Sequence, residues 1–307
     1  MKRIVFMGTP EFAIPCLESL IDRYEVLLVV SQPDRPSGRG RKIKPTPIKE
    51  VALEHSINVF QPENINSQNS FKKLSKLDAD FYVVVAYGQI ISQEILNLPK
   101  EATINVHASL LPKYRGGAPI HRAILDGKTK TGVTTMLVER GLDTGPILMQ
   151  KTIEINAQHT TGDLHDLLAV KGAKLLVETI ENFYSITPKK QCNLDSTYAK
   201  LLESEDRVID WSNSGEAIFN QIRGLNPWPL AYTHFKNKRL IITKSEKVKA
   251  TKGVGGEIIG IDENGPVVKA GNDTALILLE VKPQGKSAMT GDDFLRGYQL
   301  DLGDRLK

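Results

Sequence analysis

The sequence predicts an α/β protein with two domains, a mainly parallel sheet flanked by helices and then a smaller domain of short strands. Its 307 residues correspond to about two domains of ~150 residues each. Short apolar runs alternate with helical patterns through the first half of the chain, which is typical of βαβ units. Closely spaced β-rich runs follow in the last third, and these indicate a small barrel or a sandwich.

Buried strands and amphipathic helices alternate in the first half. Residues 26–30 form a continuous apolar run, as expected of a strand covered on both faces. Phe12, Leu17 and Leu20 recur at helical spacing, and Pro15 lies in the first turns, where its missing N–H is tolerated. The predicted strands are residues 4–7, 26–30, 81–86, 103–107, 133–138 and 147–155, and the predicted helices are residues 12–22, 48–55 and 164–183.

The pattern changes after Phe183. We predict an N-terminal domain over residues 1–188, a linker over residues 189–206, which lack a clear period, and a C-terminal domain over residues 207–307. In the last of these, turn residues separate the short strands. An OB-like barrel is one fit to this spacing, and such barrels often bind nucleic acid. The predicted elements are a helix over 214–224 and strands over 231–235, 239–243, 256–261, 267–270 and 275–281.

Positive charge is concentrated in two segments. Residues 35–49 and residues 236–252 each carry a net charge of +6, whereas the whole chain carries +4, so the remainder is acidic at −8. Such a concentration of positive charge favours binding to a polyanionic partner. The alternative is a pair of solvated lysine-rich loops.

Several classes of protein are excluded by composition. The apolar run at the start of the chain is too short for a signal peptide, and no stretch approaches the ~18 apolar residues that span a membrane, so we expect a cytoplasmic protein that does not bind membranes. Two cysteines, Cys16 and Cys192, cannot build a disulfide framework or a zinc cluster, and we expect no metal. No apolar heptad seam is visible, so we expect a monomer without an obligate protein partner.

The glycine patterns do not predict a bound nucleotide. No G-x-G-x-x-G or P-loop motif is present, so the phosphate cradle that those sites require is missing. Gly38 and Gly40 lie among arginines instead, and they indicate a flexible basic loop that orders on a ligand.

The strongest local signal is an amide and an imidazole at the end of a predicted strand. Asn105 and His107 are two apart, so their side chains project from the same face. Ligands of open α/β sheets bind at the carboxyl ends of the strands. These side chains could therefore stabilise an oxyanion or move a proton. The alternative is a structural histidine at a strand end.

A second candidate, Asp143, lies between Gly141 and Gly145, 36 residues after His107. Glycines let the backbone come close to a ligand, and a carboxylate beside a histidine holds it in one orientation and favours its charged form. An aspartate between glycines is otherwise a plain turn residue. His121, His159 and His165 complete no metal set and are interpreted as structural or surface groups.

The combination of motifs resembles the methionyl-tRNA formyltransferase family, within the folate-dependent formyltransferase superfamily. Residues 105–112 carry the superfamily pattern, and the loop at residues 32–40 and the second domain are more specific to the tRNA enzymes. The matching segments are FMGTPEF at 6–12, QPDRPSGRG at 32–40, VVAYG at 84–88, NVHASLLP at 105–112, YRGGAPI at 114–120, GLDTG at 141–145, IDWS at 209–212 and NPWP at 226–229.

The resemblance implies a Rossmann-like domain followed by an OB-like, tRNA-binding domain. It also implies transfer of a formyl group from 10-formyltetrahydrofolate to the α-amino group of initiator methionyl-tRNA, for translation initiation. Asn105, His107 and Asp143 would be the catalytic group, with direct attack of the amine on the formyl carbon. The folate would be lined by Ser109, Leu110, Leu111, Pro112, Val85, Ala86, Tyr87 and Gly88. The tRNA would contact Arg35, Arg39, Arg41, Lys42, Lys44, Lys247 and Lys249, with Arg39 near the acceptor end.

Other functions remain open at this point. A formyltransferase acting on an amino-sugar nucleotide or a purine precursor would share residues 105–112, although the arginine-rich loop argues against it. A hydrolase of formyltetrahydrofolate would release formate without an acceptor. A non-catalytic RNA-binding protein would retain the charge pattern, but Asn105, His107 and Asp143 are all present.

Overall fold

The computed structural model describes residues 1–37 and 42–307, which form two compact units. The first unit contains Met1–Gly116, Thr131–Ile153 and His165–Ala199, and the second contains Gly117–Lys130, Glu154–Leu164 and Lys200–Lys307. Both units are therefore assembled from separate stretches of chain. The domain boundaries predicted at residues 188 and 206 stay a prediction.

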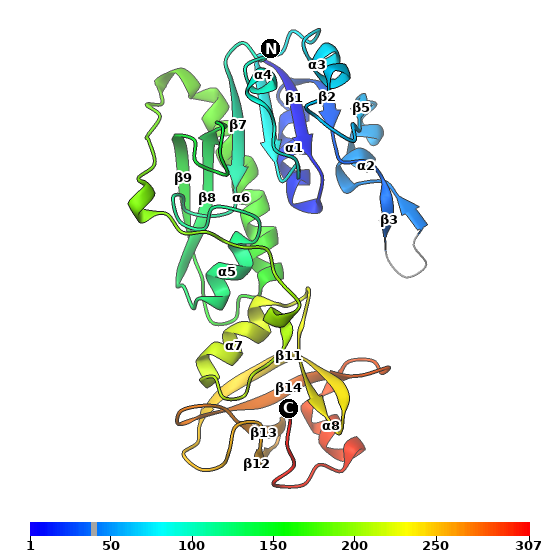
Figure 1. Ribbon diagram of the computed structural model, residues 1–307, viewed down its shortest axis with the longest axis vertical. Helices are drawn as coiled ribbons and strands as arrows, with labels where there is room; N and C mark the ends of the chain where they lie inside the picture. Colours follow the sequence, from blue (N-terminus) through cyan, green and yellow to red (C-terminus); the bar gives the residue numbers. More distant parts are fainter. Residues whose placement is uncertain (38–41) are drawn as a thin grey trace. The chain divides into compact units, whose positions relative to one another are not determined.

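The first unit is built on a sheet of seven strands in the order β5-β2-β1-β6-β7-β8-β9 (Figure 1). The pairs β2–β5, β1–β2, β1–β6 and β6–β7 are parallel, and β7–β8 is antiparallel, which confirms the predicted mainly parallel sheet. The strands are β1 (Arg3–Gly8), β2 (Glu25–Val30), β5 (Val59–Phe60), β6 (Phe81–Val85), β7 (Ala102–His107), β8 (Lys130–Leu137) and β9 (Ile147–Glu154).

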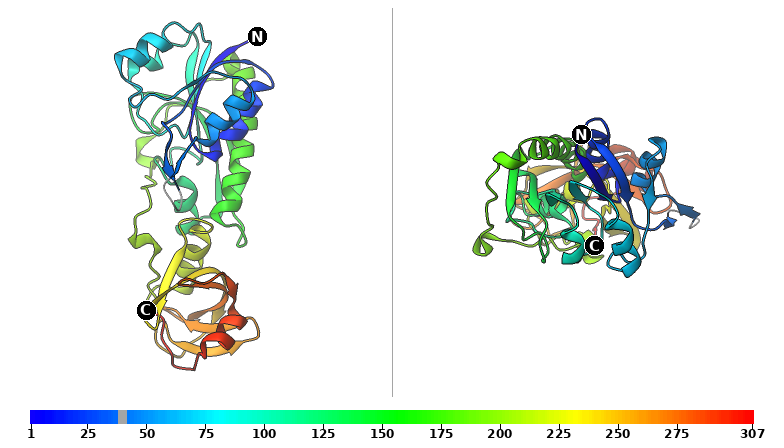
Figure 2. Two further views of the ribbon diagram at one scale, coloured as in Figure 1. Left: turned by 90° about the vertical axis from the view of Figure 1, so that its right-hand side faces the viewer. Right: turned by 90° about the horizontal axis from the view of Figure 1, so that it is seen from above.

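Helices cover the sheet of the first unit. Gly172 of the long helix α6 lies against Val106 and Val133, where an added Cβ would come within 3.0 Å of Val106, so this helix packs closely on β7 and β8 (Figures 1 and 2). The predicted helices are confirmed, whereas α3 and α4 are too short to show a period in the sequence. The helices are α1 (Ile14–Ile21), α2 (Pro47–Glu54), α3 (Gln68–Leu74), α4 (Gln93–Leu96) and α6 (Thr161–Glu181).

The second unit contains an antiparallel sheet in the order β10-β11-β14-β13-β12, with β15 paired to β14. Figure 1 labels β11, β12, β13 and β14. Bridges from Leu306 to Phe235 and from Arg305 to Glu257 place the last residues of the chain between the two ends of this sheet, as in a barrel. The strands are β10 (Ala231–Phe235), β11 (Lys238–Lys249), β12 (Ile258–Asp262), β13 (Gly265–Lys269), β14 (Thr274–Pro283) and β15 (Met289–Thr290).

Three helices accompany that sheet: α5 (Pro119–Leu125), α7 (Gly215–Gly224) and α8 (Gly291–Tyr298). Trp211, Ile218 and Phe294 contribute to its buried core. The sequence predicted α7 but not α5 or α8. The last of these is short and polar, with acidic residues in its first turn, so its apolar period is weak.

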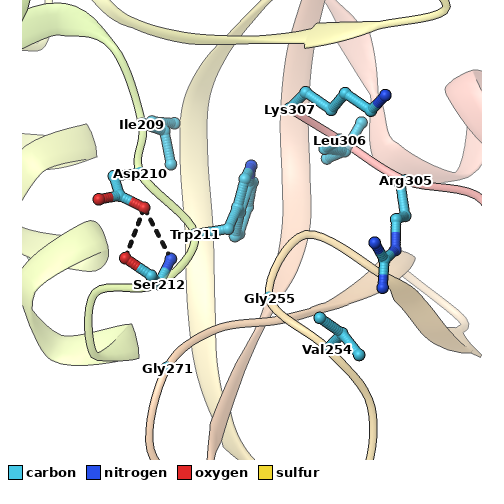
Figure 3. A pocket seen from close by; sticks show the side chains of 10 residues that line it. All are labelled: Ile209, Asp210, Trp211, Ser212, Val254, Gly255, Gly271, Arg305, Leu306 and Lys307. Atoms are coloured by element: carbon cyan, nitrogen blue, oxygen red, sulfur yellow. Dashed lines mark hydrogen bonds between the residues drawn. The ribbon is translucent and has the colours of Figure 1, made fainter.

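A cavity of about 380 Å³ opens in the second unit beside Trp211 (Figure 3). Asp210 at its edge accepts hydrogen bonds from the backbone N–H and the hydroxyl of Ser212, at 2.9 and 2.7 Å. Arg305 and Leu306 line the opposite wall. None of the predicted catalytic or folate-binding residues lines this cavity, so it is not the predicted catalytic site.

An ion pair holds α5 to residues 200–206 within the second unit. The Arg122 guanidinium donates to both carboxylate oxygens of Asp206, at 2.9 and 2.7 Å. The guanidinium also donates to the carbonyls of Lys200 and Leu201. This hydrogen bonding from Arg122 holds the pKa of Asp206 below its usual value. Because the folded-state pKa is lowered, the pair stabilises the protein above about pH 4 and loses its contribution as pH falls through that pKa.

We therefore expect Arg122→Met to lower the free energy of unfolding by roughly 1–3 kcal/mol at pH 7, because Asp206 loses a charged hydrogen-bond donor. The difference from the parent protein should shrink as pH approaches 3. Urea unfolding across this pH range measures it. Arg296→Met on α8 is the control, since Arg296 and its partner Asp292 are exposed and should matter little. Equal losses in the two variants at pH 7 would contradict the prediction.

Two further features bear on function. Among residues 1–37 and 42–307, no helix combines the length and apolar character required to cross a lipid bilayer. Within the same described ranges, histidine, cysteine and carboxylate side chains form no group of three suited to a metal ion.

Candidate active site

The predicted catalytic residues lie at one edge of the sheet in the first unit. β1 and β6 pair in parallel with Gly8 opposite Val85, and β7 is parallel to β6, so these strands end at the same edge. Strand order also changes direction here, because β2 lies on one side of β1 and β6 on the other. Such switch points are where open α/β sheets bind ligands. The end of β7 delivers Asn105 and His107 to this edge.

His107 is buried and meets protein atoms on both ring nitrogens. Nε2 lies 2.8 Å from the carbonyl oxygen of Tyr114. A carbonyl only accepts, so this hydrogen bond requires the proton on Nε2. Nδ1 lies 3.6 Å from Oδ2 of Asp143. The predicted proximity of His107 and Asp143 is therefore confirmed, while their catalytic roles stay a prediction.

Asp143 is held in an unusual turn. Its φ of +53° lies in the left-handed region, which costs a non-glycine residue roughly 1 kcal/mol. The backbone N–H of Gly116 donates to Oδ2 of Asp143 at 2.8 Å. A Cβ on Gly145 would lie 1.8 Å from the Leu137 carbonyl oxygen, so only glycine fits there. Gly145 thus permits the turn, and the backbone N–H of Gly116 aims the carboxylate. That the glycines let a ligand come close stays a prediction.

Asn105 offers an unused amide. The residue is 8% exposed, and its side chain meets no hydrogen-bond partner among the residues that the structure describes. Nearly buried amides are normally hydrogen-bonded. An unpaired amide beside His107 is therefore suited to a ligand oxygen.

The predicted folate-binding residues of the loop after β6 differ in exposure. Ala86 and Gly88 are exposed and have positive φ values of +47° and +93°, whereas Val85 and Tyr87 are buried. The Tyr87 carbonyl accepts hydrogen bonds from Thr9 at 2.8 Å and from Gln32 at 3.3 Å, which fixes the loop. Burial raises the pKa of the Tyr87 phenol to about 12, so this side chain stays neutral.

The second predicted folate segment, residues 109–112, is largely committed to the protein. Ser109 is fully buried and donates to the Lys113 carbonyl at 2.6 Å. Thr134 contacts the backbone of Ser109 and Leu111, and Leu111 itself is buried. Leu110 and Pro112 are half-buried. Gln150 and Thr197 donate to the carbonyls of Leu111 and Pro112, so the two half-buried side chains are the parts of the segment that remain available to a ligand.

The predicted tRNA loop is described only in part. Arg39 and Arg41 lie outside the described residues, as does the side chain of Lys42. Arg35 and Lys44 pair across a short hairpin, β3 (Arg35–Ser37) with β4 (Lys42–Lys44), and both are exposed.

Asp34 anchors the first strand of this hairpin through an ion pair with Lys49 and a hydrogen bond of 2.6 Å from Gln61. Burial alone would raise the pKa of Asp34, but these two contacts outweigh burial and hold the pKa below its usual value. Lys49, one of the six positive charges counted in residues 35–49, is therefore a structural partner of Asp34.

The predicted tRNA residues of the second unit are not equivalent. Lys247 forms an ion pair with Glu216 and lies 5.0 Å from the centre of the Phe219 ring. Lys249 is exposed and forms no ion pair within the described part of the chain. Within the described part of β11, the charge of Lys247 is thus partly neutralised by Glu216, whereas the charge of Lys249 is not neutralised by an ion pair.

Sequence reasoning missed the residues that support the site. Tyr114 supplies the acceptor for His107, and Gln191 donates to the carbonyl oxygens of Asp143 and Gly145, at 2.9 and 2.7 Å. Arg115, 1% exposed, donates to Gln191. Gln191 lies in the predicted linker, where no period indicated a structural role. The only local signal for a supporting role was the presence of polar side chains such as Gln191 and Asn193 in a stretch without periodicity.

Two family models match the chain. One, described as formyl transferase, matches residues 1–180, and another, described as formyl transferase, C-terminal domain, matches residues 201–299. Methionyl-tRNA formyltransferase of Bacillus subtilis (strain 168) is 48% identical over 310 residues, covering 100% of this chain and 98% of that protein. The protein of the same name from Clostridium novyi (strain NT) is 46% identical, covering 99% and 100%.

Solved structures also resemble the chain. The N-formyltransferase of Helicobacter canadensis, in complex with folinic acid and dTDP-3-aminofucose, has a TM-score of 0.67 and 20% identity, covering 91% of this chain and 99% of that one. HypX from Aquifex aeolicus, in complex with tetrahydrofolic acid, has a TM-score of 0.61 and 16% identity, covering 99% and 50%. At such identities the likeness shows the fold alone.

Proposed function

This chain belongs to the methionyl-tRNA formyltransferase family, and we propose that its catalytic centre is formed by Asn105, His107 and Asp143. The enzyme transfers a formyl group to the amino group of initiator methionyl-tRNA, with a folate as co-substrate. We propose 10-formyltetrahydrofolate as the donor. The 3.6 Å approach of the Asp143 carboxylate to the His107 imidazole supports this assignment most directly. Because the acceptor is an aminoacyl-tRNA, we place the reaction in the cytoplasm.

The nucleophile needs little activation. An α-amino group has a reference pKa near 8, so an appreciable fraction is neutral around pH 7. Direct attack on the formyl carbon then proceeds without an activated serine or cysteine. The protein must instead stabilise negative charge on the formyl oxygen and accept a proton from the amine. The bond between the formyl carbon and the folate nitrogen then breaks, and that nitrogen takes up a proton as the folate leaves.

Asn105 is the proposed donor to the formyl oxygen. Its side-chain amide carries two N–H donors and meets no other partner within residues 1–37 and 42–307. A donor held in a largely buried position costs no reorganisation when charge develops. Its place at the end of β7 keeps this amide next to His107.

His107 and Asp143 form the proposed proton-handling pair. The carbonyl of Tyr114 keeps a proton on Nε2, so Nδ1 is the nitrogen that gains or loses one next to Asp143. Asp143 orients the imidazole and helps to collect the amine proton. For His107 to donate to the formyl oxygen as well, its Nε2 has to leave the Tyr114 carbonyl.

The loop after β6 is the proposed binding site of the folate ring. Ala86 and Gly88 expose backbone at the edge where β1, β6 and β7 end, and Thr9 and Gln32 fix the loop from behind. We propose that this backbone holds the folate ring, with Leu110 and Pro112 providing apolar contacts. The folate supplies the formyl carbon. The buried hydroxyl of Ser109 acts on the ligand only by shaping the segment.

The second unit is the proposed partner of the tRNA backbone, together with the hairpin of Arg35 and Lys44.

We expect Lys249→Glu to weaken tRNA binding and to reduce the slope of log affinity against log salt by about 1. The reason is that binding releases fewer counterions when one phosphate contact is lost. Lys247→Glu should change the slope less, since Glu216 already neutralises Lys247. Filter binding at several salt concentrations measures both. The KM for folate should not change in either variant. An unchanged slope in Lys249→Glu would show that this lysine contacts only solvent.

One assay tests the function as a whole. The purified protein is supplied with 10-formyltetrahydrofolate and methionyl-tRNA, and formyl-methionine is sought after hydrolysis of the ester. Formylation of the charged initiator tRNA, with little turnover of free methionine or amino sugars, is the expected result. Release of formate without any acceptor would indicate a hydrolase instead.

A further inference from the structure

A short segment of the first unit, residues 189–199, contacts both protein groups that face His107. We call it the brace segment. Thr197 accepts from the backbone N–H of Tyr114 through its hydroxyl at 2.8 Å, and its carbonyl accepts from the N–H of Arg115 at 2.9 Å. Gln191 donates to the turn that carries Asp143. Resting on the proposed function, we infer that Gln191, held by Arg115, is a positioning residue that keeps Asp143 against His107.

The chemistry of Gln191 fixes its orientation. Its Nε2 has two N–H donors, and they go to the carbonyl oxygens of Asp143 at 2.9 Å and Gly145 at 2.7 Å. Its Oε1 accepts from Nε and Nη2 of Arg115, at 3.0 and 2.9 Å. A guanidinium only donates and a carbonyl only accepts, so a flipped amide would lose all four hydrogen bonds. Gln191 therefore binds both sides in a single arrangement.

These contacts close a ring around Asp143. Arg115 donates to Gln191, Gln191 donates to the Asp143 carbonyl, and Gly116, the residue after Arg115, donates to the Asp143 carboxylate at 2.8 Å. Both the backbone and the side chain of Asp143 are thus tied to the same short loop. A non-glycine residue in the left-handed region is strained and keeps that conformation only when neighbouring contacts fix it. These hydrogen bonds therefore keep the Asp143 carboxylate close to His107.

Arg115 is buried for this task. The side chain is 1% exposed, and its Nη1 also donates to Asn193 at 3.1 Å. Its described hydrogen-bond partners are side-chain amides rather than a carboxylate, so its charge strengthens each bond. Asn193 touches the guanidinium but makes no hydrogen bond to the Asp143 turn in the described structure. It therefore provides a matched comparison for Gln191.

Gln191→Glu separates positioning from stability. The carboxylate still accepts hydrogen bonds from Arg115, so the buried guanidinium keeps this partner. It cannot donate to the carbonyls of Asp143 and Gly145. We expect kcat to fall about 10- to 100-fold, because a displacement of ~1 Å at a reacting group can cost ~100-fold. The KM values for folate and tRNA should stay within about threefold. The melting temperature should fall about as much as in Asn193→Ala, because the carbonyls of Asp143 and Gly145 lose their donors, so the two variants should differ in kcat.

Two controls decide whether Gln191 acts through Asp143. Asn193→Ala should lower the melting temperature but keep kcat within about twofold. In an Asp143→Asn background, Gln191→Glu should cost less than about threefold in kcat, because the group that it positions is already disabled. The inference is overturned if Gln191→Glu retains wild-type kcat or if Asn193→Ala lowers kcat as much as Gln191→Glu does. It is also overturned if the kcat losses of Asp143→Asn and Gln191→Glu multiply fully in the double variant.

The same set of variants tells the two proposals apart. If Asp143→Asn lowers kcat but Gln191→Glu does not, Gln191 has no positioning role and the catalytic assignment stands. If Asp143→Asn itself keeps full kcat, the proposed role of Asp143 fails. A fall in kcat for Gln191→Glu alone would then show that the residue acts on another group.

Discussion

Asp143→Asn should lower kcat by about 100- to 10,000-fold while leaving the KM values for folate and tRNA nearly unchanged. The asparagine keeps an oxygen that accepts from the N–H of Gly116, so the turn should persist. What it removes is the negative charge 3.6 Å from Nδ1 of His107, and with it the acceptor for the amine proton. Positioned proton transfer typically contributes 10²–10⁴-fold, which sets the expected range. His107→Ala should produce a loss of similar size.

Single-turnover formylation with saturating substrates measures this effect. Leu142→Ala is the matched control, because Leu142 precedes Asp143 on the same turn and is 56% exposed. Its kcat should stay within about threefold of the parent. Since His107 and Asp143 act on one proton, the double variant should lose little more than either single variant. A fully multiplicative loss, or wild-type kcat in Asp143→Asn, would remove the pair from the mechanism.

Asn105→Ala should lower kcat by about 100- to 1,000-fold, the usual cost of losing one donor to a developing oxyanion. Folding should be little affected, because the amide has no hydrogen-bond partner in the part of the chain that the structure covers. Steady-state formylation, together with thermal unfolding, measures both quantities. The KM for tRNA should hardly move, since the donor acts chiefly when charge develops.

A second substitution at this position sharpens the test. Asn105→Asp keeps the shape but replaces the donors by a carboxylate that only accepts, so it should be at least as inactive as Asn105→Ala. If Asn105→Asp retained more activity than Asn105→Ala, the side chain would serve packing rather than the formyl oxygen. If neither variant lost kcat, another donor would have to stabilise the charge.

Periodicity predicted most of the first unit correctly because its strands are continuous apolar runs and its longer helices keep a clear period. It failed where elements were short or polar. The strand β5 has two residues and α4 has four, too few to show any period, and α8 begins with Gly291-Asp292-Asp293. β11 extends to Lys249, although the prediction ended at residue 243, because alternating lysines in its second half resemble a loop.

The sequence by itself determined the α/β class, the candidate trio and the family, because these depend on residue types and their spacing along the chain. The geometry of the contact between His107 and Asp143, the pairing of Lys247 with Glu216 and the support from Gln191 were decided only by the tertiary structure. The physical reason is that each joins residues distant in sequence, through hydrogen bonds that no local pattern encodes. The brace segment, residues 189–199, shows this best, since a stretch without periodicity supports the proposed catalytic turn.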